Sequence, residues 1–163
     1  MGWSAGARIT FGIQVESPED GEAYAKWEAL QEEWDFDGIG DEALAWGLGY
    51  RPEEHPDSSD WAWLREQATD GLEPCVRYGS YPDEAYTTFF AVMPPWGRDD
   101  DNPTGDLGAH ACPSGPQKLN LYGKGLPAKE VLDKWGERLV AAAEALGLTI
   151  VDGPGFFLVV DYG

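Results

Sequence analysis

Residues 126–162 read LPAKEVLDKWGERLVAAAEALGLTIVDGPGFFLVVDY, and they predict a helix followed by a strand. Pro127 suits the first turn of a helix, where no backbone N–H is needed. Gly147 stands where a left-handed helix stop is expected, and an apolar run of strand length follows it at 156–160. Between the two, apolar residues recur at spacings of three and four, as on one face of a helix: Val131, Leu132, Trp135, Leu139, Val140, Ala143 and Leu146. A helix that returns onto a sheet is therefore the expected organising unit.

The upstream residues supply the other elements of a single domain spanning residues 1–163. Alternating apolar residues from Ile9 to Val15 predict a half-buried strand, and a Ser-Pro-Glu-Asp start predicts a helix over about 18–34. Two strand-like runs, 74–81 and 86–93, predict a hairpin, and 119–122 a short edge strand. The order predicts an α+β fold with a ferredoxin-like βαββαβ antiparallel sheet and two helices on one face.

Two segments do not fit this simple order. Residues 35–73 carry many tryptophans and acids without a strand period, which indicates an acidic, Trp-rich insertion or lid. Residues 94–117 read as a long loop rich in Gly, Pro and Asp. The strands at 86–93 and 156–160 are apolar on both faces, so the second face of the sheet needs cover. We expect the insertion to cover it, and a second subunit is the alternative.

The charge balance limits the possible partners. The chain has 30 acidic and 11 basic residues, a net charge of −19, and 18 of the acids against 3 bases lie between Glu16 and Glu73. Nucleic acid and anionic membranes would be repelled, whereas basic protein surfaces, cations or plain solubility are favoured. No apolar run approaches the roughly 20 residues of a membrane span, and no secretion signal is visible. We expect a cytoplasmic monomer or homodimer.

The acids of this region form an array that is interleaved with tryptophans. One interpretation is a solvated face that aids solubility; the other is a set of carboxylates that imitates nucleic-acid phosphates and occupies the basic cleft of another protein. Among the tryptophans most are expected in the core, and one or two as anchors that stack on arginines of the partner. The candidate anchors are Trp46, Trp61 and Trp63. The array comprises Glu32, Glu33, Asp35, Asp37, Asp41, Glu42, Glu53, Glu54, Asp57 and Asp60.

Neither a metal, a cofactor nor a catalytic site is expected from the motifs. His110 and Cys112 are the one close His/Cys pair, and a structural zinc site needs four ligands. The loop from Asp99 lacks the glycine and glutamate of a calcium-binding EF-hand, although weak cation binding stays open. No nucleophile elbow or phosphate-binding loop is present. Cys75 and Cys112 are expected as reduced thiols, with one disulfide as the alternative.

The two ends of the chain resemble small uncharacterised proteins of tailed bacteriophages. The resemblance rests on the opening strand, residues 8–13, and on the closing run FFLVVDYG, residues 156–163. It implies a phage-encoded accessory protein that acts by binding a basic surface of a host protein, for example as a nucleic-acid-mimicking inhibitor. A virion accessory or decoration subunit is one alternative. A small-molecule-binding protein, with its pocket between sheet and insertion, is another.

Overall fold

The computed structural model describes residues 5–81, 84–93, 117–119 and 126–162. The expected loop at 94–117 lies outside these ranges apart from Gln117, and so do His110 and Cys112. The elements follow one another as β1 (Ala5–Glu16), α1 (Gly21–Trp34), α2 (Asp41–Leu48), α3 (Asp60–Glu66), β2 (Glu73–Tyr81), β3 (Glu84–Met93), β4 (Gln117–Leu119), α4 (Lys129–Leu146) and β5 (Thr149–Tyr162). The two long helices and the closing strand are confirmed, and Gly147 ends α4 with φ of 76°.

Within these ranges five strands form one antiparallel sheet in the order β2-β3-β1-β5-β4, which confirms the α+β class. β1 lies at its centre, where Phe11 pairs with Val92 of β3 on one side and with Phe156 of β5 on the other. The predicted hairpin is present as β2 and β3. The edge strand β4 pairs with β5 slightly earlier in the chain than the expected 119–122.

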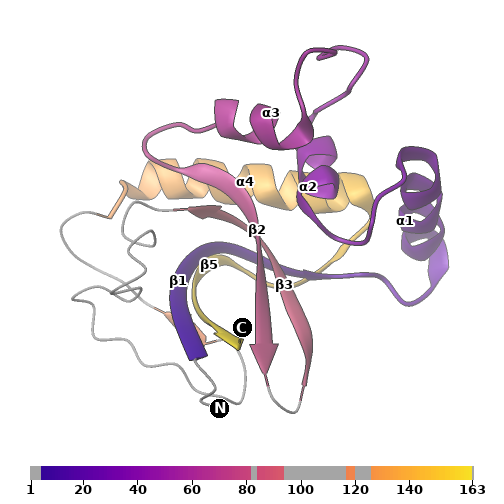
Figure 1. Cartoon of the computed structure of the whole chain (residues 1–163). Helices are drawn as coiled ribbons and strands as arrows, with labels where there is room; N and C mark the ends of the chain where they lie inside the picture. Colours follow the sequence, from indigo (N-terminus) through magenta and orange to yellow (C-terminus); the bar gives the residue numbers. More distant parts are fainter. Residues whose placement is uncertain (1–4, 82–83, 94–116, 120–125, 163) are drawn as a thin grey trace.

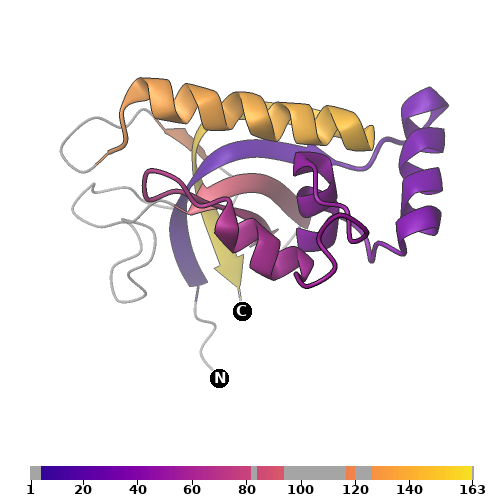
Figure 2. The same ribbon diagram turned by 90° about the horizontal axis from the view of Figure 1, so that it is seen from above.

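Helix α4 lies across one face of the sheet (Figures 1 and 2) and buries its apolar stripe there, including Trp135 and Leu139. α2 packs closely against α4, since a Cβ on Gly47 would lie 2.8 Å from the carbonyl oxygen of Ala142. α1 stands to one side and buries only Trp27. The expected layer of two long helices on this face is therefore not confirmed: α2 packs beside α4, α3 packs against α2 and β2, and α1 reaches the same core through Trp27.

The segment 35–73 contributes no residue to the buried cluster on the second face of the sheet, so the expectation that this segment covers that face is wrong. Its buried residues Leu44, Trp63 and Leu64 belong to the same core as Phe11 of β1 and Trp135 of α4. The physical reason is that α2 and α3 each carry an apolar side of their own, and α2 buries its side against α4 while α3 buries its side against α2 and β2.

The second face of the sheet carries a buried cluster of its own, and the sheet curves toward it. Phe89, Ala91, Phe157 and Val159 form a separate buried cluster there, with Cys75 of β2 packed against it. Strand β2 comes close to β5 although β3 and β1 separate them in the sheet. In a flat sheet these strands would lie about 14 Å apart, at roughly 4.8 Å per step. The sheet therefore curls toward this face, and β3 and β5, which flank β1, can be apolar on both sides.

Gly12 in the centre of β1 makes the curl possible. A Cβ at this position would lie 2.1 Å from the carbonyl oxygen of Phe90 and 2.7 Å from the Cα of Ala91. Immediately after Gly12 the β1–β5 pairing shifts register, opposite Gly153 with φ of 101°. Such irregularities bend strands. Across the bend, Phe89 and Phe157 meet with ring centroids 5.2 Å apart.

We predict that Gly12→Ala destabilises the protein by about 1–3 kcal/mol or more, because the added methyl group meets backbone atoms that cannot move aside. Urea denaturation monitored by tryptophan fluorescence measures this. Gly40→Ala is the matched control, since its added Cβ would meet nothing nearer than Tyr78 Oη at 3.5 Å, and it should cost less than about 1 kcal/mol. Equal losses for the two variants would contradict the role given to Gly12.

Candidate functional site

Three helix ends meet on one side of the molecule. Asp35 closes α1 in the left-handed conformation (φ of 56°), and its N–H donates to the carbonyl of Gln31. The chain then turns through Gly38, at φ of 73°, into the start of α2. The hydroxyl of Tyr78 donates to the carbonyl of Ile39 at 2.9 Å, which ties this turn to strand β2. The turn is thus held by the sheet on one side and by α2 on the other.

The N-termini of α2 and α3 bring acidic side chains to this point. Asp41 and Glu42 lie in the first turn of α2, and Asp60 lies in the first turn of α3. Ser59 caps α3, with its hydroxyl accepting from Ala62 N at 3.1 Å. The positive ends of both helices favour these three carboxylates. Asp35 and Asp37 join them from the C-terminal end of α1; we call these five residues the carboxylate cluster.

The pKa values indicate that members of the carboxylate cluster act on one another. Burial raises the pKa of Glu42, and the charges of Asp60, Asp35, Asp37 and Asp41 raise it further. Burial also raises the pKa of Asp41, a hydrogen bond from the backbone of Val76 opposes this, and Asp60 adds to the increase. None of the five forms an ion pair with a described lysine or arginine, in contrast to Asp133 of α4, which lies 3.3 Å from Lys129 Nζ.

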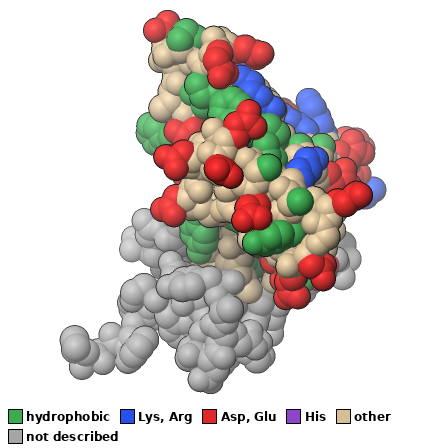
Figure 3. Space-filling view, turned by 90° about the vertical axis from the view of Figure 1, so that its right-hand side faces the viewer, with side chains coloured by type: hydrophobic (Ala, Val, Ile, Leu, Met, Phe, Trp, Pro, Cys, Tyr) green, Lys and Arg blue, Asp and Glu red, His purple; other side chains and the backbone are tan. Residues whose placement is uncertain are grey.

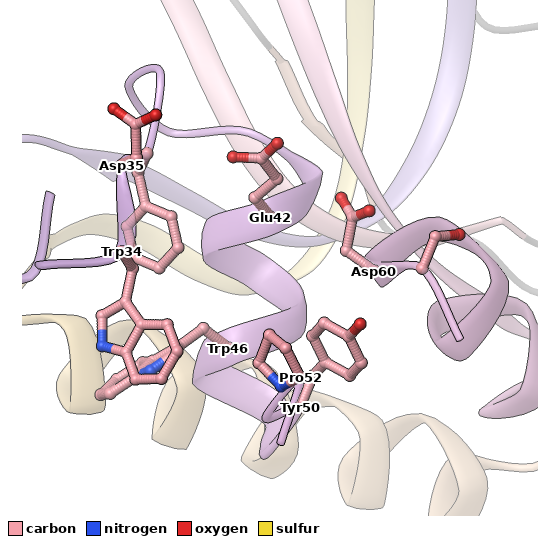
Figure 4. A pocket seen from close by; sticks show the side chains of 9 residues that line it. Trp34, Asp35, Glu42, Trp46, Tyr50, Pro52 and Asp60 are labelled. Atoms are coloured by element: carbon pink, nitrogen blue, oxygen red, sulfur yellow. The ribbon is translucent and has the colours of Figure 1, made fainter. Parts of the chain in front are cut away.

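A cavity of about 310 Å³ opens beside the carboxylate cluster, and we call it the aromatic cavity. Figure 4 shows rings along one side of it and the carboxylates of Glu42 and Asp60 on the other. A neighbouring hollow of about 250 Å³ shares Glu42 and Asp60 and adds Asp37 and Asp41. The lining of the aromatic cavity comes from α1, α2, the first residue of α3 and the loops that join the helices: Trp34, Asp35, Phe36, Glu42, Trp46, Tyr50, Pro52, Ser59 and Asp60.

An arginine lies against two of these rings. The guanidinium carbon of Arg51 is 4.0 Å from the ring centroid of Trp46 and 6.0 Å from that of Trp34. Its Nη1 donates to the carbonyls of Trp46 at 2.9 Å and Tyr50 at 2.7 Å, which satisfies acceptors at the end of α2. Arg51 is not among the residues that line the aromatic cavity. Its guanidinium is therefore stacked next to the cavity and leaves it open.

The structure brings together half of the acidic array. The carboxylate cluster contains five of its ten members, and the other five line neither of the two hollows. Figure 3 shows acidic side chains in separate groups, with apolar and uncharged surface between them. Glu32 and Glu33 are exposed on α1, and Glu53, Glu54 and Asp57 are exposed in the segment before α3. The array is thus one cluster with outlying charges.

The three candidate anchors have different surroundings. Trp46 is half-buried and lines the aromatic cavity. Trp61 is 57% exposed, and Arg65 lies 4.7 Å from its ring centroid. Trp63 is only 7% exposed and packs against Tyr50, so its proposed role as an exposed anchor is wrong.

Sequence reasoning did not select the other three rings of the cavity as anchors, namely Trp34, Phe36 and Tyr50. Trp34 ends α1 and is followed directly by Asp35, and Phe36 lies between Asp35 and Asp37, so both carry a local signal of an aromatic beside a carboxylate. Phe36 and Tyr50 lie outside the helices, where no periodicity indicates which way a side chain points.

The remaining expectations concern metals, thiols and membranes. Among the described residues, no group of three or more His, Cys, Asp or Glu side chains is placed to hold a metal ion. Cys75 is a free thiol, and burial raises its pKa to about 11, so it is protonated at neutral pH. Within the same ranges no helix has both the length and the apolar character needed to span a membrane.

No protein-family model matches the chain, and no curated protein or solved structure is significantly similar to it.

We predict that Asp35→Asn stabilises the protein by about 0.3–1 kcal/mol at neutral pH and low salt. The change removes a negative charge from the negative end of α1 and removes the repulsion between Asp35 and the Glu42 carboxylate. Asparagine also tolerates the left-handed backbone conformation of this position. Because the pKa of Glu42 is raised in the folded protein, its share of the repulsion is present at neutral pH and is lost as the pH falls through that raised pKa. The gain in the free energy of unfolding should therefore be smaller at acidic pH than at neutral pH.

Urea denaturation at neutral and acidic pH measures this gain. Asp20→Asn is the matched control, because Asp20 precedes the favourable N-terminal end of the same helix. It removes the same charge from a protein of net charge −19 without relieving the cluster. A similar gain from both substitutions would show that overall charge, and not the local arrangement, sets the effect.

Proposed function

We propose that this protein is a small acidic interaction protein, of the kind that tailed phages encode, which binds a basic surface of a host protein in the cytoplasm. The observation that carries the proposal is the carboxylate cluster, five acids gathered at three helix ends and unpaired with any described lysine or arginine. Burial, and after it the charges of neighbouring acids, raise the pKa of Asp41 and Glu42, so their charged forms are disfavoured in the free protein.

A cationic partner would remove this cost. Positive charges placed against Asp41 and Glu42 stabilise the ionised forms and return the free energy lost to repulsion. The net charge of −19 would also speed the encounter with a basic surface and make binding sensitive to salt. A face kept only for solubility would gain nothing from concentrating its charges against one another. Local violations of charge rules are expected at functional sites.

The basic surface that suits such a cluster best is a nucleic-acid-binding cleft. Its lysines and arginines are arranged to neutralise closely spaced phosphates. Carboxylates that occupy the cleft would compete with nucleic acid and inhibit the host protein. Binding of a small molecule is the second candidate, and the aromatic cavity is the observation that favours it. The two functions share the same surface.

We also infer that the fold is a ferredoxin-like core with additions. Without β4, the strand order β2-β3-β1-β5 is the order that a βαββαβ chain gives. On this interpretation β4 is an appended edge strand, and residues 35–73 are an insertion that carries the carboxylate cluster. The displaced position of α1 is the main departure from a two-helix layer.

Binding to purified basic nucleic-acid-binding proteins of the host tests the proposed function. We expect at least one of them to bind, with affinity that falls by about ten-fold or more between 50 and 200 mM salt. The variant Asp37→Asn/Asp41→Asn/Glu42→Gln/Asp60→Asn should bind at least about ten-fold more weakly. Calorimetry or surface plasmon resonance measures both effects, and added nucleic acid should compete.

The matched control neutralises four acids outside the carboxylate cluster: Glu32→Gln/Glu33→Gln/Glu53→Gln/Glu54→Gln. It changes the net charge equally and should weaken binding by less than about three-fold. Equal losses of affinity for the two quadruple variants would show that net charge, and not the carboxylate cluster, determines binding. Binding that is indifferent to salt, or absent throughout the panel, would contradict the proposed function.

A further inference from the structure

We infer that the aromatic cavity binds the guanidinium group of an arginine side chain that the basic partner presents, an inference that rests on the proposed function. The cavity holds about 310 Å³, at the lower end of the range for small-ligand sites. That volume suits one side chain or a ligand of similar size. It lies at the edge of the carboxylate cluster, so an arginine seated in it would extend the contact made by the charges.

The aromatic side of the cavity supplies surfaces on which a flat cation stacks. Trp34 reaches it from α1, Trp46 from α2, and Tyr50 from the loop that follows α2. Aromatic rings attract cations through their negative faces, and tryptophan does so most strongly. Arg51 demonstrates the preference within the molecule, since its guanidinium lies 4.0 Å from the Trp46 centroid. That arginine is tied to two backbone carbonyls beside the cavity and does not fill it.

The opposite side of the cavity supplies hydrogen-bond acceptors. The carboxylates of Glu42 and Asp60 lie there in Figure 4, and Asp35 lies above the rings. None of the three is paired with a described lysine or arginine. Glu42 is also the member of the carboxylate cluster on which the other four charges act. A cation at this point would therefore meet carboxylate acceptors that have no described lysine or arginine partner. It would also lie beside Glu42, on which the other four charges act.

Guanidinium is the cation that uses both sides at once. It is planar, so its face stacks on a ring while its edge presents five N–H donors to carboxylates. A lysine ammonium has donors but no flat face. A quaternary ammonium suits an aromatic cage but has no donors, so Glu42 and Asp60 would attract it without hydrogen bonds. Walls of rings facing carboxylates thus favour arginine over lysine.

The first test titrates the ¹⁵N-labelled protein with methylguanidinium and follows the assigned indole signals of Trp34 and Trp46. These signals should shift with saturation, and the affinity should exceed that for tetramethylammonium by at least about five-fold. Methylurea, a neutral compound of the same shape, should produce no saturable shift. Equal affinity for tetramethylammonium or methylurea would overturn the assignment, as would shifts confined to other parts of the protein.

Glu42→Gln should weaken methylguanidinium binding by about ten-fold, because a neutral amide replaces the charged acceptor. Glu54→Gln is the matched control, exposed and outside the cavity, and should change the affinity by less than about two-fold. The chemical-shift spectra of both free variants confirm that they are folded. An unchanged affinity in Glu42→Gln would overturn the proposal.

The second test separates a partner's arginine from a free cation. A lysine-rich octapeptide with one central arginine should bind the protein about ten-fold more tightly than the all-lysine peptide, and Glu42→Gln should abolish the difference. If methylguanidinium binds but the two peptides bind equally, the cavity takes a free cation and the inference fails while the proposed function stands. If methylguanidinium binds and neither peptide does, the proposed function fails as well.

Discussion

The close approach of β1 to β3 at Gly12 is the constraint on which the rest of the structure depends. Backbone atoms of Phe90 and Ala91 occupy the space that a side chain at Gly12 would need. The sheet can therefore curl until β2 comes near β5, and its inner face closes over Phe89 and Phe157. The outer face is left for α4. Helix α2 then packs on α4 at Gly47, a second position where a side chain would collide with a backbone carbonyl.

These two contacts between backbones decide where the acids lie. With α2 fixed against α4 and α3 packed against α2, the N-termini of both short helices meet the C-terminus of α1. Helix dipoles favour Asp41, Glu42 and Asp60 at this point, but they disfavour Asp35. The packing energy of the core thus holds together carboxylates that repel one another. A site assembled in this way is arranged before its partner arrives, which lowers the cost of binding.

The sequence predicted the elements of this fold better than their contacts. Helix α4 was predictable from a proline at its start, a glycine at its end and a regular apolar stripe between them. The central strand β1 was predictable from its alternation of apolar and other residues. The position of α1 was not predictable, because its capping signals set where a helix begins and not what it packs against; the structure buries only Trp27. The cover of the second face was misjudged for a similar reason. Curvature comes from Gly12 and a register shift, which the pattern of apolar residues does not show.

Only part of the candidate site could be predicted from the sequence, and the physical reason differs from residue to residue. Charge density alone indicated the region that contains Asp35, Asp41 and Asp60, because so many acids in one segment cannot all disperse. Which half of the array gathers depends on the turn at Gly38 and on the packing of α2, and neither is a local property. Trp63 was misassigned because an aromatic residue among acids reads equally well as core or as anchor.

The central claim is that the fold forces these carboxylates into one interacting group in the free protein. Titration of the side-chain carboxyl carbons by NMR tests it most directly. The account predicts that Asp41 and Glu42 titrate above their ordinary pKa values of 3.8 and 4.5, and that Asp60→Asn lowers the pKa of both. Ordinary values for the two residues, unchanged by Asp60→Asn, would contradict it.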